Sequence, residues 1–165
     1  MKTSIALFIL FFSAQSVASL QYCDPYTTAS TPNTRFKIVD NEVVDDKTGL
    51  IWQRCALGQK GENCTGQALT YTWSDALIIA NQKKQLDTKA WRLPNVSELK
   101  SLIEYKCYNP AINLKVFPET PGGFFWTSDM HENYMDFAWY VYFYYGYAYH
   151  YYIDRENYVR LVRNP

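Results

Sequence analysis

Aromatic and polar positions alternate most regularly near the C-terminus, where residues 138–153 read AWYVYFYYGYAYHYYI. Successive side chains of a β-strand point to opposite faces of its sheet. The pattern therefore predicts that Trp139, Val141 and Phe143 point into a core, while the tyrosines between and after them point outward. The outer face of this strand is then expected to be a wall of phenols.

Short apolar runs nearer the N-terminus predict a hairpin of small strands. Phe36–Val39 and residues 43–44 have the composition of strands, and residues 45–49 carry the polar and glycine residues of a turn. The turn leads into a third apolar run at residues 50–52.

A 3.6-residue period then predicts a first helix. Thr72 is the expected N-terminal cap, and Trp73, Ala76, Leu77 and Ala80 fall at the spacing of one helical face. We expect that face to pack on the core.

A second helix is predicted directly after Pro94. Asn95 is its expected cap and Glu98 sits at the third helical position, which together form a capping box. The apolar stripe consists of Val96, Leu99, Leu102 and Ile103. The helix is expected to end near Tyr105.

The remaining segments predict a loop and three more strands. Residues 109–123 contain three prolines and two adjacent glycines and are expected to be mostly loop, whereas residues 124–128, 138–143 and 158–163 are expected to be strands. The predicted fold class is therefore α+β, with two helices packed on a twisted, mainly antiparallel sheet. We place the main domain at residues 36–165, preceded by an N-terminal arm at residues 20–35.

Residues 1–19 have the form of a secretory signal peptide. Lys2 supplies a positive start, an apolar run follows at residues 5–12, and small residues at positions 17–19 are suited to cleavage. The apolar run is too short to span a bilayer. Cys23 raises the alternative of a lipid anchor, but bacterial lipoprotein signals need a small residue where Tyr22 stands. We expect a protein that is secreted, periplasmic or at the cell surface.

The chain has four cysteines, and an even number in an oxidising compartment predicts disulfides. Three pairings are open. We favour Cys55 with Cys64, because the glycine-containing segment between them closes easily, which leaves Cys23 to pair with Cys107. Zinc is the competing use, but no Cys-x-x-Cys pair is present and we expect no metal.

Charge excludes some partners. The chain carries 16 basic and 16 acidic residues, and loss of Lys2 with the signal peptide leaves 15 against 16. A nearly neutral chain has no overall field for nucleic acid, so none is expected as a partner. No second apolar run of membrane length follows the signal peptide, so we expect no stable membrane insertion.

A series of short motifs gives the chain a family likeness. They are DKTGLIWQ at 46–53, CTG at 64–66, Trp73 with Ala76, WRLP at 91–94 followed by Glu98 and Leu99, AIN at 111–113 with FP at 117–118, FWTS at 125–128, and VRLVR at 159–163. From about residue 36 to residue 163, the sequence resembles the Lcl C-terminal domain family, whose members were long known only as bacterial domains of unknown function.

The resemblance implies a fold related to C-type lectins and to the formylglycine-generating enzyme. It also implies a surface or secreted adhesin, since the better-known relatives bind sulphated polysaccharides such as glycosaminoglycans. The calcium-dependent sugar motifs of animal lectins are absent here, so no calcium-bridged sugar is expected. A collagen-like stalk is absent too, so a homo-trimer would have to form through the domain itself.

Catalysis is not predicted. The neighbouring acids at 45–46 and at 154 and 156 fit solvated turns, and His131 and His150 belong to no recognisable catalytic spacing. Enzymes of the formylglycine-generating type use cysteine or copper chemistry, whereas these cysteines are expected to be structural. We therefore expect no enzyme and no cofactor.

Recognition is the favoured function. Tyrosine gives a large contact area at low entropic cost and keeps a hydroxyl for a partner, and its ring can face the C–H side of a sugar. A glycan or glycosaminoglycan-like polysaccharide is the first candidate partner and a protein the second, while packing between copies is the alternative for the same surface. The candidate ligand-binding residues are Tyr140, Tyr142, Tyr144, Tyr147, Tyr149, His150, Tyr151, Asp154, Arg155 and Asn157.

Other conspicuous residues receive structural interpretations. Arg160 and Arg163 are expected to pair internally with acids such as Asp46 or Glu98, whereas Arg155 is the better binding candidate. The five tryptophans stand beside apolar neighbours and are expected in the core.

Overall fold

The computed structural model describes residues 20–87 and 89–165. The expected signal peptide at residues 1–19 lies outside the described residues. The elements, in chain order, are β1 (Tyr22–Cys23), η1 (Asn33–Arg35), β2 (Phe36–Val39), β3 (Glu42–Asp45), β4 (Ile51–Gln53), β5 (Thr70–Tyr71), α1 (Trp73–Asp87), α2 (Val96–Lys100), β6 (Cys107–Tyr108), β7 (Phe124–His131), β8 (Tyr134–Tyr142), β9 (Tyr147–Tyr152), β10 (Asn157–Tyr158) and β11 (Val162–Arg163).

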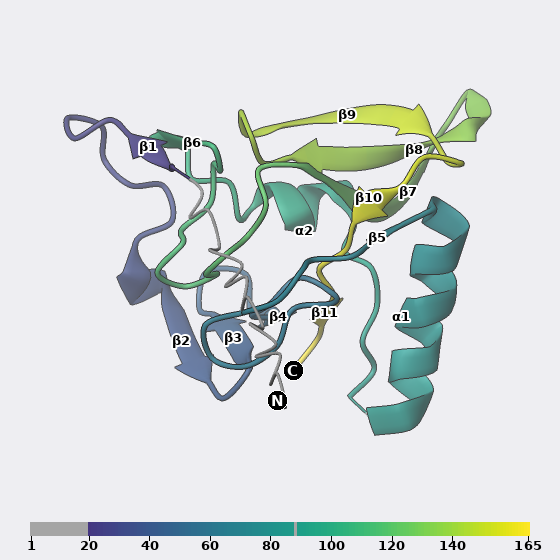
Figure 1. The fold of residues 1–165 in the computed structure, drawn as a ribbon, viewed down its shortest axis with the longest axis horizontal. Coiled ribbons are helices and arrows are strands. Elements are labelled where there is room, and N and C mark those ends of the chain that lie inside the picture. Colours follow the sequence, from purple (N-terminus) through teal and green to yellow (C-terminus); the bar gives the residue numbers. More distant parts are fainter. Residues whose placement is uncertain (1–19, 88) are drawn as a thin grey trace, which may run out of the picture.

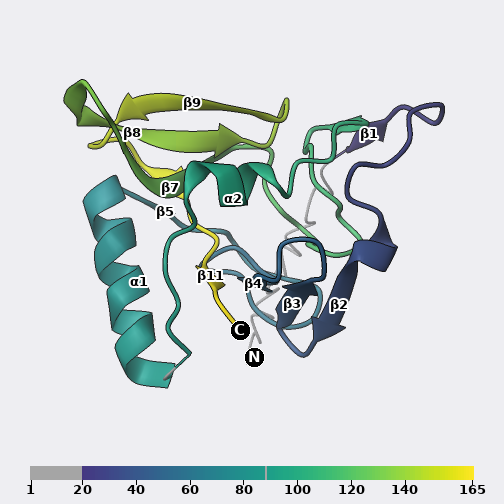
Figure 2. The same cartoon turned by 180° about the vertical axis from the view of Figure 1, so that it is seen from behind.

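The described strands form three sheets rather than the one that the sequence predicted. A five-stranded sheet has the order β5-β10-β7-β8-β9, a four-stranded sheet has the order β11-β4-β3-β2, and β1 pairs with β6. Figure 1 shows the long β8–β9 hairpin at one end of the molecule and α1 standing beside it, and Figure 2 shows α2 between the two larger sheets. The α+β class and the mainly antiparallel pairing are confirmed, although β10 and β7 run parallel.

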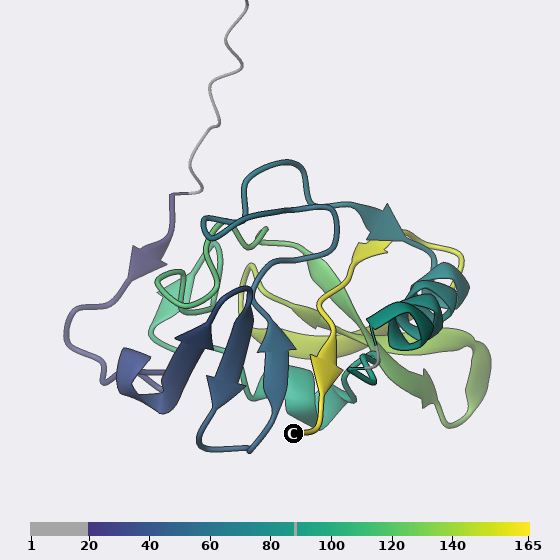
Figure 3. The same cartoon turned by 90° about the horizontal axis from the view of Figure 1, so that it is seen from below.

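The predicted strand at residues 158–163 is wrong in one respect. The chain leaves the five-stranded sheet after Tyr158 and joins the four-stranded sheet at Val162, where β11 lies next to β4 (Figure 3). Between them the side chain of Arg160 is fully buried, and its guanidinium donates to the carbonyl oxygens of Gln53, at 2.8 Å, and Arg54. This segment therefore connects the two sheets and belongs to neither.

The first helix begins as predicted. The Asp75 backbone N–H donates to Thr72 Oγ1 at 3.2 Å, and the Thr72 hydroxyl donates to the Asp75 carboxylate at 2.7 Å. Ala76 and Ala80 are buried, whereas Trp73 and Leu77 are half-buried. Small residues at the buried positions let the helix axis approach the sheet closely.

The second helix has the predicted capping box. The Glu98 N–H donates to Asn95 Oδ1 at 2.7 Å, and the Asn95 N–H donates to the Glu98 carboxylate at 2.8 Å. The helix ends at Lys100, however, and not near Tyr105. Beyond it Ile103 forms a β-bridge with Ile112, which requires extended backbone and stops the helix.

Apolar side chains fill both faces of the five-stranded sheet. On one face Phe125, Val141 and Phe143 join a cluster that includes Leu99 of α2. On the other face Trp126, Ala138 and Tyr140 join a cluster that includes Ala76 and Ala80 of α1. Of the five tryptophans, Trp52, Trp91 and Trp126 are buried, while Trp73 and Trp139 are half-buried.

Both predicted disulfides are confirmed. Cys55 is bonded to Cys64, and Cys23 is bonded to Cys107. The second bond fastens the N-terminal arm to the rest of the molecule beside the β1–β6 ladder. Within the described residues, no helix is both long and apolar enough to cross a membrane.

Candidate functional site

The β8–β9 hairpin places five of the predicted tyrosines on one face of the sheet. Tyr142 pairs with Tyr147, Tyr140 with Tyr149 and Ala138 with Tyr151. Directly opposite residues of an antiparallel ladder project from the same face. We call Tyr140, Tyr142, Tyr147, Tyr149 and Tyr151 the tyrosine face.

Exposure divides the tyrosine face into two parts. Tyr147, Tyr149 and Tyr151 on β9 are 45%, 55% and 43% exposed, whereas Tyr140 on β8 is 7% exposed. The expectation that Tyr140 points into solvent is therefore wrong. Its ring belongs to the same apolar cluster as Ala76 and Ala80 of α1, and it lies 4.8 Å from the ring of Phe124 on the neighbouring strand β7.

Burial has an electrostatic effect on this phenol. Desolvation, reinforced by the neighbouring Tyr147, Tyr149 and Tyr151, raises the pKa of Tyr140 to about 12. Desolvation also raises the pKa of Tyr142. Tyr140 is therefore a support beneath the exposed rings.

The tyrosine face extends into two aromatic residues that the sequence did not single out. Phe124 starts β7 opposite Tyr142 and stacks on its ring, with centroids 4.3 Å apart. Tyr145, which is exposed, meets the rings of Tyr142 and Tyr144 in the turn after β8. Tyr144 is half-buried and stacks on Tyr142 at 5.9 Å. The sequence pattern did not show that Phe124 of β7 pairs with Tyr142, so Phe124 could not be predicted as part of this face.

The His150 side chain does not project from the same face of the sheet as the tyrosines. It pairs with Trp139 across the ladder, and its ring lies 4.3 Å from that of His131 and 5.5 Å from that of Trp139. Its Nδ1 atom is buried and has no hydrogen-bond partner among the residues that the structure describes. Burial first, and the neighbouring His131 second, lower the pKa of His150 below its usual value. The ring also stacks on Tyr149, at 4.4 Å, so it borders the tyrosine face.

The three polar candidates after β9 lie in different environments, two exposed and one buried. The Arg155 guanidinium lies over the Tyr151 ring, 5.8 Å from its centroid, and forms an exposed ion pair with Asp154 at 3.9 Å. Both are available beside the tyrosine face. Asn157 is instead buried in β10, and its side-chain nitrogen has no partner within the described part of the chain, so the prediction that Asn157 contacts a ligand is wrong: its side chain is interior.

The two terminal arginines are structural, but with other partners than those expected. Arg160 donates to backbone carbonyls and, at 2.7 Å, to the Thr120 hydroxyl. Burial lowers the pKa of Arg160 to about 9. Arg163 donates to the Glu42 carboxylate at 2.7 Å. Glu98 is held by Arg92 and Asp46 by Lys37.

A small hollow lined by Asp136, Tyr152, Ile153 and Asp154 lies at the end of the hairpin, and a larger cavity lies away from it. A cavity of about 470 Å³ opens between the Cys55–Cys64 loop, β4 and α1, and none of the ten predicted residues lines it. Over the described residues, no group of three or more histidine, cysteine or acidic side chains is arranged to hold a metal ion.

Comparison with known proteins agrees with the motifs. The model of the Lcl C-terminal domain matches residues 41–163, which is most of the chain and includes the five-stranded sheet, β3, β4 and β11 of the four-stranded sheet, both helices and the tyrosine face. The chain belongs to the Lcl C-terminal domain family. No curated protein and no solved structure matches it. Cys23 lies before the matched region, whereas Cys107, to which it is bonded, lies within it.

Proposed function

We propose that this Lcl domain is a secreted or surface-exposed bacterial adhesin that binds carbohydrate on its tyrosine face. The observation that carries the proposal is the row of Tyr147, Tyr149 and Tyr151, whose rings are about half exposed on one side of one strand. The signal-peptide pattern and the two disulfides fit an oxidising compartment. A fold of the C-type-lectin kind is part of the proposal.

The geometry suits a saccharide chain. Alternate residues of a strand are spaced about 6–7 Å apart, so three successive rings offer a flat apolar strip longer than one sugar ring. Aromatic faces pack on the C–H side of pyranoses while the phenol oxygens remain free for hydrogen bonds. Arg155 at the end of the strip can bind a carboxylate or sulphate in bidentate fashion.

A binding role also agrees with the state of the cysteines. All four are in disulfides, so none is a free thiol for redox catalysis of the formylglycine-generating type. We therefore propose no enzymatic activity.

The experiment is a glycan array that includes sulphated polysaccharides, read at low and at physiological salt. We expect binding that persists at physiological salt and is lost in the variant Tyr147→Ser with Tyr149→Ser. The matched control is Tyr26→Ser with Tyr105→Ser, since these tyrosines are exposed away from the hairpin. Equal loss in both variants, or no binding at either salt, would remove the proposal.

A second candidate function rests on a different observation. β9 is the outermost strand of its sheet, and within the described residues no strand pairs with its other edge. The Ile153 N–H donates to the Asp136 carbonyl, so alternation along the ladder turns the N–H groups of Ala148, His150 and Tyr152 outward. An edge of this kind accepts an added strand from a polypeptide.

This protein-binding alternative has its own test. Extended peptides from envelope proteins should bind the free edge, and Ala148→Pro should abolish their binding because it removes an outward N–H group without breaking a bond to β8. Retention of glycan binding in this variant would separate the two functions. Peptide binding that is unaffected by Ala148→Pro would exclude strand addition.

A further inference from the structure

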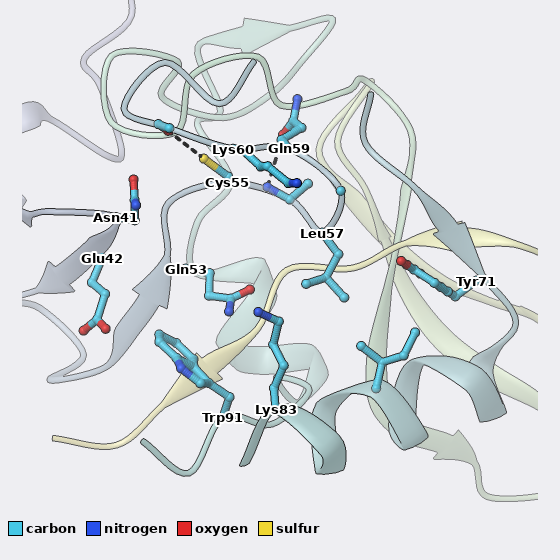
Figure 4. A pocket seen from close by; sticks show the side chains of 14 residues that line it. Asn41, Glu42, Gln53, Cys55, Leu57, Gln59, Lys60, Tyr71, Lys83 and Trp91 are labelled. Carbon is cyan, nitrogen blue, oxygen red and sulfur yellow. Dashed lines mark hydrogen bonds between the residues drawn. The ribbon is translucent and has the colours of Figure 1, made fainter. Parts of the chain in front are cut away.

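The cavity of about 470 Å³ is built from parts of the chain that are distant in sequence. The disulfide loop forms one wall, β4 and the β2–β3 turn form a second, and α1 with Trp91 forms the third. Figure 4 shows the Lys83 side chain rising from α1 toward Gln53, with Leu57 and Tyr71 beyond them. A concave site of this size is in the range of small-molecule pockets.

Two polar groups in the cavity have no protein partner. Lys83 is half-buried, yet its ammonium group forms no hydrogen bond or ion pair with any described residue. The Gln53 side-chain amide is likewise half-buried and unpaired within the described chain. The donors of this pair are therefore open to a ligand that enters the cavity.

The charge on the cavity wall is positive. Glu42 is an acidic residue that lines it, and its carboxylate is already bound by Lys89 at 2.6 Å and by Arg163 at 2.7 Å. Although burial opposes ionisation, these two bonds lower the pKa of Glu42, so it stays charged and neutralised. Lys60 at the rim and Lys83 inside remain uncompensated among the described residues.

The apolar part of the lining lies to one side of these groups. Leu57 and Ile79 face the cavity together with the Tyr71 ring. A ligand that satisfies both halves carries one anionic group for Lys83 and Gln53 and a compact apolar body of about ring size.

We infer that this cavity is a binding site for a small carboxylic acid with an apolar, ring-sized body. The carboxylate accepts hydrogen bonds from Lys83 Nζ and the Gln53 amide, and the body packs on Leu57, Tyr71 and Ile79. The site is separate from the tyrosine face and does not depend on the proposed adhesin function.

The test is an NMR titration of the ¹⁵N-labelled, oxidised protein with phenylacetate as the probe. We expect millimolar binding with shifts concentrated at the backbone amides of Gln53, Leu57 and Lys83. Phenylacetamide, which has the same ring without the charge, should bind at least roughly tenfold more weakly, because a charge-assisted hydrogen bond contributes more than a neutral one.

The matched variants are Lys83→Gln and Lys84→Gln, which remove neighbouring charges from the same helix. Lys84 is exposed and does not line the cavity. Lys83→Gln should weaken phenylacetate binding roughly tenfold, while Lys84→Gln should leave it unchanged. Shifts outside the cavity, equal binding of phenylacetamide, or equal affinities of the two variants would each overturn the inference.

Discussion

Tyr140 lies directly opposite Tyr149 across the β8–β9 ladder, yet one phenol is buried and the other is half exposed. Two residues on the same face of a sheet differ in this way because β8 lies between β7 and β9, with the Phe124 ring 4.8 Å from the Tyr140 ring, whereas β9 is the outermost strand of the sheet. The tyrosine face is therefore a boundary between core and surface.

Because of this burial, we predict that the Tyr140 phenol ionises at a higher pH than an ordinary tyrosine. In the difference between wild type and Tyr140→Phe, the absorbance of ionised tyrosine at 295 nm should rise with a midpoint near pH 12. The stabilisation that the neutral Tyr140 phenol provides is complete below pH 10.0, its ordinary pKa, and is lost as the pH rises through the raised value. Tyr134→Phe, at an exposed position, is the control. A Tyr140 midpoint near 10 would show that the ring is solvated.

For Glu104 we predict the opposite pH dependence of stability, in the acidic range. Its buried carboxylate accepts backbone N–H bonds from Ser30 at 2.9 Å and Thr31 at 2.8 Å, together with both hydroxyls. Burial opposes ionisation, but these bonds prevail and lower the pKa of Glu104 below 4.5. The stability it provides is present above pH 4.5 and is lost as the pH falls through the lower folded-state value.

Glu104→Gln should therefore destabilise the protein by about 2–4 kcal/mol at pH 7, because an amide nitrogen cannot accept these bonds. The cost should shrink in acid, where the wild-type carboxylate is protonated as well. Urea unfolding at pH 7 and at pH 3 measures both values. A cost that is the same at the two pH values would contradict the assignment.

The two disulfides should differ in their contribution to stability. Their cysteines are separated by 84 residues in the Cys23–Cys107 bond and by 9 in the Cys55–Cys64 bond. By the loop-entropy relation, removing the first as a double alanine variant costs about 4–5 kcal/mol and removing the second about 2.5–3 kcal/mol. Thermal unfolding of the two variants gives the order, and a reversed order would show that the arm is dispensable for stability.

Gly146 controls how the tyrosine hairpin sits on the core. It has a φ of +76°, and a Cβ at this position would lie 2.8 Å from Ile103 Cγ2 and 3.0 Å from Ala111 Cβ. Gly146→Ala should cost about 2–5 kcal/mol, the sum of left-handed strain and a steric clash. Gly49 has a similar φ of +72° with no atom within 4 Å, so Gly49→Ala should cost only about 1–2 kcal/mol. If chemical denaturation gives the same loss of unfolding free energy for Gly146→Ala and Gly49→Ala, the clash is ruled out.

Local patterns predicted the parts of this fold that depend on neighbours in sequence. The caps at Thr72 and Asn95 and the small disulfide loop all involve residues within ten positions of each other, and the structure confirms them. The alternation along residues 138–143 was also sufficient to place Val141 and Phe143 in the core.

The errors arise where distant segments meet. Tyr140 is buried beside Phe124 of β7 in a cluster shared with α1, and this surrounding is not encoded in the strand's own alternation. Asn157 is taken inside because β10 lies between β5 and β7, a neighbourhood made by long-range pairing. The cavity around Lys83 combines three segments for the same reason, so no single stretch of sequence indicates it.

Alternate residues of the short strand β9 pack on the core and form the exposed surface. Ala148 packs against the core, whereas Tyr147, Tyr149 and Tyr151 contribute little to it. In the adhesin that we propose, mutations at the three tyrosines would therefore change the ligand-binding rings at little cost in folding, while the backbone of the strand stays in register. On the proposed function, the edge strand is the position at which this domain would evolve new specificity with little effect on its stability.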